Sequence, residues 1–599
     1  MRKLFVPVAL ILLLIAAPNF TYGQSKISVS FQVDFDGPNH KFLVSMSIQG
    51  IKRDSLLLKM PAWTPGYYQL LHFADNVSGL KITNTQGKEI SFIKSGRNGW
   101  KFASGKEDQF TISYEVKATR SFVATPYVDV YRAYIEPTGV FMFVNGMMNQ
   151  PSTVSINLPN EWTAATGLEP VKNSKNQFSA SDFDVLYDSP ILCGILEEIP
   201  SFEVKGIKHR FTGYKLGDFD KTAFSGDMKK IVEEGAAVIG DIPYMHYTFL
   251  AIGPGPGGIE HLNSTTFGFS GNSLKTDEGK KRMYTFLAHE YFHHYNVKRI
   301  RPIELGPFDY DKENRTNMLW VSEGITVYYD ELIARRAGLL TDDDLLKGLR
   351  GRLLGYENKP GRLYQSATQA SFNTWSDGPF GRSEDEINKT VSVYDKGAIL
   401  GLMLDFNIRH LTKNKKSLDD VMRALYKEYY QQKKRGFTEA EFQATCESIA
   451  GSKLTELFEY VSTVKPPDYK KYFAYGGLSI DTEPKPVEGA WLGITARMRN
   501  DSLMVSNVEY ESPAWKAGVR RRMAILQVGG ESRKSLDPMM ADRKEGEKVA
   551  LQIFQKGRSS EVNVELTKKI EPDFKITVVA SPTELQKEIL KSWTSSHVK

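Results

Sequence analysis

Polar and apolar residues alternate in short runs along the first third of the chain. The runs include ISVSFQVDF, HKFLVSMSIQ, QFTISYEVKA and STVSINL, and Gly, Asn, Pro and Asp separate them from Ser25 to about Glu203. A period of two residues predicts strands with one buried face. Many short strands without intervening helices favour an antiparallel β-sandwich over residues 24–205.

The pattern changes after about Asp218, where apolar residues recur every three to four positions. DMKKIVEEGAAVIGDI and MLWVSEGITVYYDELIARRAG follow this helical period, and the stretch from Asp342 to about Val464 continues it. We therefore expect a second domain over residues 206–475 that is mainly helical from about residue 340.

The VKPPDYKKYFAYGG segment has the proline and glycine content of a domain boundary. After it, AWLGITARM, SLMVSNVEY, KVALQIFQKG and SEVNVELTKK again alternate. These runs predict a smaller β-rich domain over residues 480–570, followed by a C-terminal tail, residues 571–599. The whole chain is thus expected to be a multidomain α+β protein.

Residues 1–23 have a different character. Two positive charges precede an apolar run from Leu4 to Ala17, which is short for a membrane span, and small residues around Thr21 and Gly23 resemble a cleavage site. We expect a signal peptide and export to the periplasm or the extracellular space; the alternative is an uncleaved anchor. No later stretch reaches 18 apolar residues, so we expect no membrane association after cleavage.

Composition and charge narrow the function classes. The chain has 599 residues, of which 41% are hydrophobic and 25% charged, as in ordinary folded proteins. A net charge of +6 spread over this length does not indicate a nucleic-acid partner. The two cysteines, Cys193 and Cys446, exclude a disulfide framework.

The stretch LAHEYFHHYNVKRIR carries the candidate chemistry. His289 and His293 lie four positions apart on a predicted helix, so both imidazoles project from one face and can bind one metal ion. Glu290 flanks them as the general base. Buried imidazoles and a buried carboxylate are costly unless satisfied, and a metal would satisfy them. The sequence predicts one Zn²⁺ ion per chain.

A catalytic zinc site normally has three protein ligands, so a third residue is required. Glu323 is the strongest candidate because it opens an apolar helix and has no lysine or arginine at i+4. The alternative is a helix N-terminal glutamate that the helix dipole favours. Asp330, two turns later, is expected to orient a ligand imidazole.

HEYFHHYNVKRIRP, WVSEGITVYYDEL and SVYDKGAILGLMLD together resemble the M61 family of zinc metallopeptidases, the glycyl aminopeptidases, whose catalytic domain is similar to those of M1 aminopeptidases and thermolysin-like enzymes. The resemblance extends to MPAWTPGYY, to GGIEH and to a PDZ-like C-terminal unit, and so covers almost the whole mature chain. It implies that residues 206–475 form a zinc metallopeptidase domain. Tyr295 departs from the family pattern, which commonly has a tryptophan there.

The resemblance implies further roles. Gly257, Gly258 and Glu260 are similar to a glycine-rich edge-strand motif that holds the substrate's free amino terminus, with Glu260 as the anionic anchor. The alternative is a loop before a helix. Tyr394 aligns with a tyrosine that stabilises the tetrahedral oxyanion, although by pattern alone it would be a core tyrosine.

Residues 480–570 resemble a PDZ domain through WLGITA, ESPAWKAGV and EGEKVALQIFQKGRSSEVNVEL, which implies a peptide or protein partner. They depart from it where a Gly-Asp pair usually follows the AG turn, because Arg521, Arg522 and Met523 stand there. The alternative is a module that only packs on the catalytic domain.

These features together predict an exported zinc aminopeptidase that acts on peptides with a free N-terminus, and the family implies small first residues such as Gly or Ala. Two alternatives stay open. An endopeptidase on the same zinc site would differ only in whether Glu260 accepts a free amine. A peptide-binding adaptor with a vestigial zinc domain would have no chemical need for Glu290.

Overall fold

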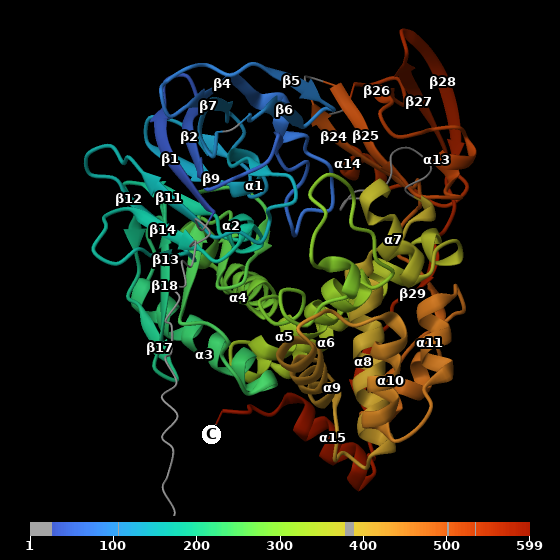
Figure 1. Ribbon diagram of the computed structural model, residues 1–599. Helices are drawn as coiled ribbons and strands as arrows, with labels where there is room; N and C mark the ends of the chain where they lie inside the picture. The colour runs from blue at the N-terminus through green and yellow to red at the C-terminus, as the bar shows by residue number, and fades with distance from the viewer. Residues whose placement is uncertain (1–26, 106, 378–387, 500–501, 533–534, 599) are drawn as a thin grey trace, which may run out of the picture.

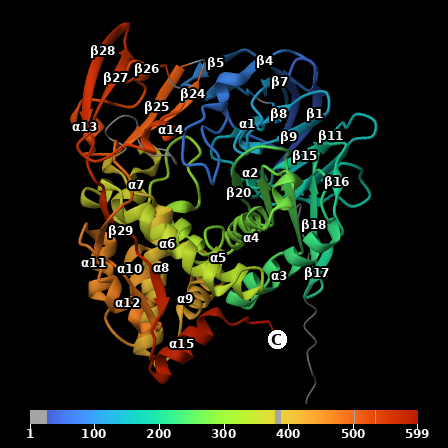
Figure 2. The same cartoon turned by 180° about the vertical axis from the view of Figure 1, so that it is seen from behind.

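The computed structural model describes residues 27–105, 107–377, 388–499, 502–532 and 535–598. The expected signal peptide, residues 1–23, lies outside the described residues. Figures 1 and 2 show strands in the blue and teal N-terminal region, helices from green to orange, and further strands in red. The expected multidomain α+β architecture with several sheets is confirmed. Among the described residues, no helix has both the length and the apolar character needed to cross a bilayer.

Three sheets build the N-terminal region. The orders are β13-β14-β11-β1-β2-β7-β4, β10-β3-β6-β5 and β12-β15-β9-β8. The first two share one apolar core and so form a sandwich. Two short helices, α1 and α2, interrupt the strands, which the alternating pattern does not predict. The elements of this region are β1 (Ser28–Asp36), β2 (Lys41–Gln49), β3 (Ser55–Lys59), η1 (Phe73–Asn76), β4 (Val77–Asn84), β5 (Phe92–Ser95), β6 (Gly99–Ala103), β7 (Gln109–Lys117), β8 (Tyr127–Val128), β9 (Arg132–Ile135), α1 (Pro137–Val140), β10 (Phe143–Val144), β11 (Ser152–Ile156), β12 (Thr163–Thr166), β13 (Glu169–Pro170), β14 (Gln177–Ala180), α2 (Phe183–Tyr187) and β15 (Ile191–Gly194).

A six-stranded sheet opens the central region, with the order β16-β18-β19-β21-β20 and with β17 paired to β18. Strand β20 lies at the edge, antiparallel to β21. Strands β19 to β21 precede the part expected to be mainly helical; every residue of β21 and all but the first of β19 are buried, so they show no alternation. The elements are β16 (Glu197–Glu198), β17 (Phe202–Val204), β18 (Ile207–Gly213), α3 (Lys221–Ile239), β19 (His246–Ala251), β20 (Gly258–Glu260), β21 (Ser264–Phe267), η2 (Gly271–Lys275) and α4 (Asp277–Phe292).

Helices dominate the region that follows. Helix α8 is buried along most of its length and contacts η4, α5, α6 and α12. One large apolar core runs from the six-stranded sheet through these helices. The elements are η3 (Ile303–Leu305), η4 (Trp320–Ile325), α5 (Thr326–Arg336), α6 (Asp342–Glu357), η5 (Pro360–Leu363), α7 (Ala367–Asp377), α8 (Val393–Leu411), α9 (Leu418–Leu425), η7 (Tyr426–Lys433), α10 (Glu439–Ala450), α11 (Thr455–Ser462) and α12 (Tyr469–Tyr475).

The C-terminal region is β-rich, as expected, with a five-stranded antiparallel sheet, β24-β25-β26-β27-β28, around its own apolar core. The expected tail is structured: β29 and β30 pair back with β23 and β22, and α15 packs on the helical region. The elements are β22 (Leu478–Ile480), β23 (Pro484–Pro486), β24 (Ile494–Arg499), β25 (Ser502–Val508), α13 (Pro513–Lys516), β26 (Ala524–Val528), α14 (Asp537–Met540), β27 (Lys548–Gln555), β28 (Arg558–Glu565), β29 (Ile570–Pro572), β30 (Ile576–Val578) and α15 (Glu584–Thr594).

Candidate metal centre

Helix α4 brings two histidines to one point. The helix begins after Thr276, whose hydroxyl accepts a hydrogen bond from the Gly279 amide at 3.1 Å. At its other end, His289 and His293 lie one turn apart, and their Nε2 atoms are 2.9 Å from each other. Both imidazoles therefore face the same small volume.

Glu323 supplies a carboxylate to this volume from η4, a π-helical segment that leads into α5. Its Oε2 lies 3.3 Å from His293 Nε2 and 3.9 Å from His289 Nε2. One ligand atom from each side chain falls within 4.8 Å of the others. Two imidazoles and one carboxylate are a donor set of catalytic zinc sites. The three residues fit zinc and form a possible metal site.

The far ring nitrogens of both histidines have acceptors. Nδ1 of His289 lies 3.2 Å from Asp330 Oδ2, and Nδ1 of His293 lies 2.8 Å from the Asn296 carbonyl oxygen. An acceptor at Nδ1 holds the proton there and leaves the Nε2 lone pair directed toward a metal. Asp330 thus makes the contact that its position on the helix predicts.

The electrostatics of the cluster favour positive charge. Burial and the charge of His293 lower the pKa of His289 to about 3. Burial also acts to lower the pKa of His293, but the charges of Glu323 and Glu260 outweigh it and raise the value to about 10. The buried carboxylates Glu323 and Glu260 therefore favour a positive charge on His293. The same carboxylates would favour a divalent cation bound at this point.

Glu290 points from α4 toward strand β20. Its carboxylate is buried, and burial raises its pKa to about 8. A Cβ built on Gly258 would lie 2.3 Å from Glu290 Oε1, so only a glycine permits this approach. Oε2 of Glu290 has no hydrogen-bond partner among the described residues. A carboxylate with a pKa near 8 can both accept and release a proton close to neutral pH.

Strand β20 brings Glu260 to the same site. The strand has a free edge, and Gly257 just before it has a φ of 93°, which favours glycine. Glu260 is 5% exposed, yet no described residue forms a hydrogen bond or an ion pair with its carboxylate. A buried carboxylate without a partner calls for a cation. The geometry is suited to a cation such as an ammonium group.

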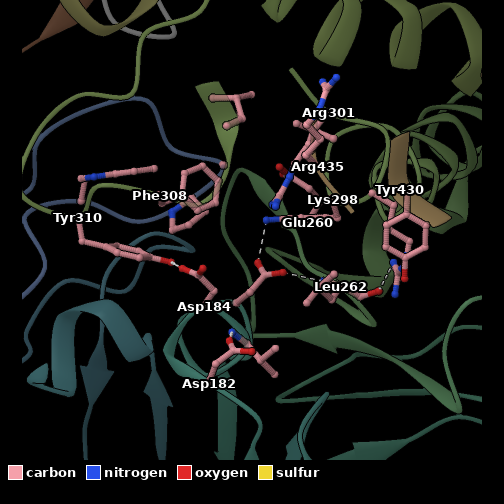
Figure 3. Close-up of a pocket in the computed structure, with 18 of the residues that line it drawn as sticks. Asp182, Asp184, Glu260, Leu262, Lys298, Arg301, Phe308, Tyr310, Tyr430 and Arg435 are labelled. Atoms are coloured by element: carbon pink, nitrogen blue, oxygen red, sulfur yellow. Dashed lines mark hydrogen bonds and ion pairs between the residues drawn. The ribbon is translucent and has the colours of Figure 1, made fainter. Parts of the chain in front are cut away.

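Glu260 also lines a cavity of about 300 Å³, which Figure 3 shows. Aromatic side chains form much of its wall, and these are Trp63, Tyr68, Phe308, Tyr310, Trp375 and Tyr430. On the polar side, Lys298 donates a hydrogen bond to Asp188 at 2.7 Å. Open space therefore adjoins the carboxylate of Glu260.

Tyr394 lies in the first turn of α8, half-buried beside the metal site. Its ring centroid is 6.4 Å from that of His289. Burial, followed by the charges of Glu323 and Glu260, raises its pKa well above the ordinary value. The phenol therefore keeps its proton and can donate a hydrogen bond.

Two residues of the site escape sequence reasoning. The Tyr68 hydroxyl, from the N-terminal region, donates to Glu323 Oε1 at 2.6 Å. The Asn296 side-chain amide donates to the carbonyl oxygens of Val321 and Ser322 at 2.9 and 3.2 Å, which joins the end of α4 to η4. The only sequence signal for Tyr68 is its place in MPAWTPGYY, and Asn296 has none beyond its closeness to His293.

Two family models match parts of the chain. The Peptidase M61 N-terminal domain matches residues 30–195, and M61 glycyl aminopeptidase matches residues 282–400. The second segment contains the three candidate ligands, Glu290 and Tyr394. The M61 resemblance is confirmed for these two segments. Neither match reaches the C-terminal region, whose PDZ-like character stays a prediction.

A search of curated protein sequences finds no significant match. Among solved structures, the chain is similar to an aminopeptidase N family protein from Idiomarina loihiensis, with 25% identity, coverage of 95% of this chain and 100% of that one, and a TM-score of 0.86. It also resembles an M1 zinc metallopeptidase from Deinococcus radiodurans, with 14% identity, coverage of 74% and 94%, and a TM-score of 0.47. The family matches and the first structure support a metallopeptidase.

Proposed function

We propose that the protein is a zinc aminopeptidase that removes the first residue from peptides with a free N-terminus. The observation that carries the proposal is the buried carboxylate of Glu260, which lacks a partner among the described residues and lies on an edge strand beside the His289, His293 and Glu323 cluster. An α-ammonium group would pair with this carboxylate, and the pairing would select the first peptide bond for cleavage.

His289, His293 and Glu323 would hold one zinc ion per chain. Zinc, when bound, supplies Lewis-acid polarisation of the peptide carbonyl and acidifies a water molecule. Glu290 accepts a proton from the attacking water at its free carboxylate oxygen and then delivers a proton to the leaving amine. Tyr394 donates a hydrogen bond to the carbonyl oxygen as negative charge develops there.

Strand β20 would position the substrate backbone. Its position at the edge of the sheet would let it pair with an extended peptide, and Gly258 lets Glu290 lie directly against the strand along which that peptide would run. The M61 resemblance supports small first residues such as Gly or Ala.

We also propose that residues 1–23 direct export to the periplasm or the extracellular space, and that the C-terminal β-rich domain binds a peptide or protein in a PDZ-like manner.

The test measures which bond is cut and whether metal is needed. The zinc-loaded protein is incubated with an alanine peptide in free-amine and N-acetylated forms, before and after chelation, and products are identified by mass. We expect release of the first residue from the free amine only, loss of activity on chelation, and recovery with zinc. Full activity of the metal-free protein would contradict the proposal.

Two results would favour the alternatives. Cleavage of the acetylated peptide at internal bonds would favour an endopeptidase on the same site. Peptide binding without cleavage of any form by the zinc-loaded protein would favour the adaptor. The available oxygen of Glu290 argues against the adaptor, because a binding module needs no proton acceptor beside a metal.

A further inference from the structure

A second cavity, of about 580 Å³, leads away from the metal site between helices α4 and α6, with α5 beneath it. His289 lines it, and so does Phe286, one turn earlier on α4. Phe286 also contacts the strand side, because a Cβ built on Gly258 would lie 2.8 Å from its ring. The cavity therefore reaches the metal site at His289, and the Phe286 ring lies between it and strand β20.

The direction of the substrate follows from the two ends of β20. Glu260, at the end of the strand, would hold the substrate amine, whereas Gly258, at its start, faces Glu290 and Phe286. A peptide that begins at Glu260 must therefore place its leaving-group side beyond Gly258. That side is the cavity between α4 and α6.

The cations of this cavity differ in their partners. Lys281 lies 2.8 Å from Asp344, and Arg352 lies 3.4 Å from Asp395 and 3.6 Å from Glu331. Lys347 pairs with Asp343 at 2.7 Å.

Arg282 is the exception among these cations. It is exposed and lines the cavity, and no carboxylate of the described part of the chain forms an ion pair or hydrogen bond with it. One guanidinium is thus free to bind an anion.

The spacing on α4 limits what this anion can be. Arg282 and His289 are seven residues apart, which is two turns or about 10.5 Å along the helix axis. Both side chains tilt toward the helix N-terminus, so the guanidinium of Arg282 and the imidazole of His289 keep about the same separation along the axis. An extended peptide advances about 3.3 to 3.6 Å per residue. Two or three residues after the cleaved bond would therefore bring a C-terminal carboxylate to Arg282.

We propose that Arg282 binds the C-terminal carboxylate of the substrate, so that the preferred substrates are tripeptides and tetrapeptides. This inference rests on the proposed aminopeptidase function and adds a substrate class to it. The interaction is a charge-assisted hydrogen bond to a planar guanidinium, which matches a carboxylate in geometry. Longer peptides would pass the arginine without this contact.

The test compares free-acid and carboxamide forms of alanine peptides from two to six residues on the zinc-loaded full-length protein. We expect kcat/KM for the acid to exceed that for the amide about tenfold at three and four residues, and the two to be equal at six residues. Arg282→Gln should reduce kcat/KM for the free-acid peptides to the value for the carboxamides. It should leave kcat/KM for the carboxamides unchanged. Lys347→Gln, which removes an equal charge from the same cavity, should preserve the ratio.

The possible outcomes distinguish a failure of the carboxylate site from a failure of the proposed aminopeptidase function. Equal rates for acid and amide at every length in the wild type, or equal slowing of both forms by Arg282→Gln, would overturn the carboxylate site while leaving the aminopeptidase intact. Rescue of a tripeptide amide by an aspartate at its third position would also overturn it, because the contact would then be to a side chain. Failure to release the first residue from any form would overturn the proposed function itself.

Discussion

Three glutamates share the site, and their neighbours give each a different role. Glu323 faces two imidazoles and accepts a hydrogen bond from Tyr68, so its carboxylate is held in place beside them. Glu290 faces the glycine edge of β20 and keeps one oxygen without a partner. Glu260 lacks a partner altogether among the described residues. We propose that they act as metal ligand, general base and anchor of the substrate amine, the three roles that peptide cleavage at an amino terminus requires.

Glu290→Gln should keep zinc and lose most of the turnover. The amide has the same shape as the carboxylate but cannot accept the proton, and general-base catalysis contributes about 100-fold to 10,000-fold. Zinc content and kcat measured on the same sample check this. Glu203→Gln, at an exposed position on strand β17 away from the site, is the control and should behave as the wild type. Normal turnover in Glu290→Gln would refute the assignment.

Tyr68→Phe should weaken zinc binding although Tyr68 is not a ligand. Removal of the hydroxyl frees Glu323 Oε1, and loss of such a contact typically costs about 10-fold to 100-fold in metal affinity. Competition with a chromogenic chelator measures the zinc dissociation constant. Tyr67→Phe, whose hydroxyl has no hydrogen bond with a described residue, is the control. Equal zinc affinity in the two variants would show that the Tyr68 hydroxyl does not support metal binding and that the ring serves only in packing.

The contrast between His289 and Tyr68 shows what the sequence can reveal about the site. His289 and His293 are four residues apart, so a local helical period is enough to place them together. Tyr68 lies 255 residues from Glu323, and no periodicity links positions that far apart. The site could therefore be predicted where its contacts are local or match a known family, and not where the N-terminal region supplies a contact.

At the scale of elements, η4 crosses α8 at a pair of glycines. A Cβ built on Gly324 would lie 2.3 Å from the Gly397 Cα, so the two backbones are in direct contact. Glu323 precedes the first glycine, and Tyr394 lies one turn before the second. The close crossing brings the ligand and the phenol toward the same site.

Gly324→Ala should destabilise the protein and weaken zinc binding together, because the methyl group would push η4 away from α8. Overpacking of this kind costs about 1 to 3 kcal/mol. Gly351→Ala in α6 is the control, since nothing lies within 4 Å of the added methyl group and helix propensity should raise stability by about 0.5 to 1 kcal/mol. Thermal unfolding of both variants tests this. A higher melting temperature for Gly324→Ala would contradict the close crossing.

Periodicity predicts some elements well and others not at all. Strands β1, β2 and β7 alternate because one face is buried, and they lie where the sequence indicates. Strand β19 is buried at all but its first residue, and its pattern cannot be distinguished from that of a helix. Helix α15 did carry a signal, since Thr583 and Gln586 form a capping box before an amphipathic stretch.

At the scale of the whole molecule, the chain end returns to the helices of the site. Trp593 on α15 is 1% exposed, and its Nε1 donates to the Tyr328 hydroxyl at 2.9 Å. Arg336 Nε donates to the Trp593 carbonyl oxygen at 3.0 Å. Tyr328 and Arg336 belong to α5, which also carries Asp330. The C-terminal helix thus packs on the helix whose Asp330 contacts His289.

Trp593→Ala should lower the free energy of unfolding by about 3 to 5 kcal/mol, the usual cost of removing a buried tryptophan. Lys591→Ala, at an exposed position on the same helix, should change it by less than about 0.5 kcal/mol. Denaturant unfolding of the two variants measures the difference. Equal stability would show that α15 contributes little to the catalytic region.

The measurement that tests the central claim most directly compares kcat/KM for a free-amine peptide and its N-acetylated form on the wild type and on Glu260→Ala. A carboxylate that pairs with the substrate ammonium fixes both binding and register. We predict that the acetylated peptide is a poor substrate of the wild type, and that Glu260→Ala lowers kcat/KM for the free amine by about 10-fold to 100-fold. Efficient cleavage of the acetylated peptide at internal bonds, unaffected by the substitution, would contradict the account.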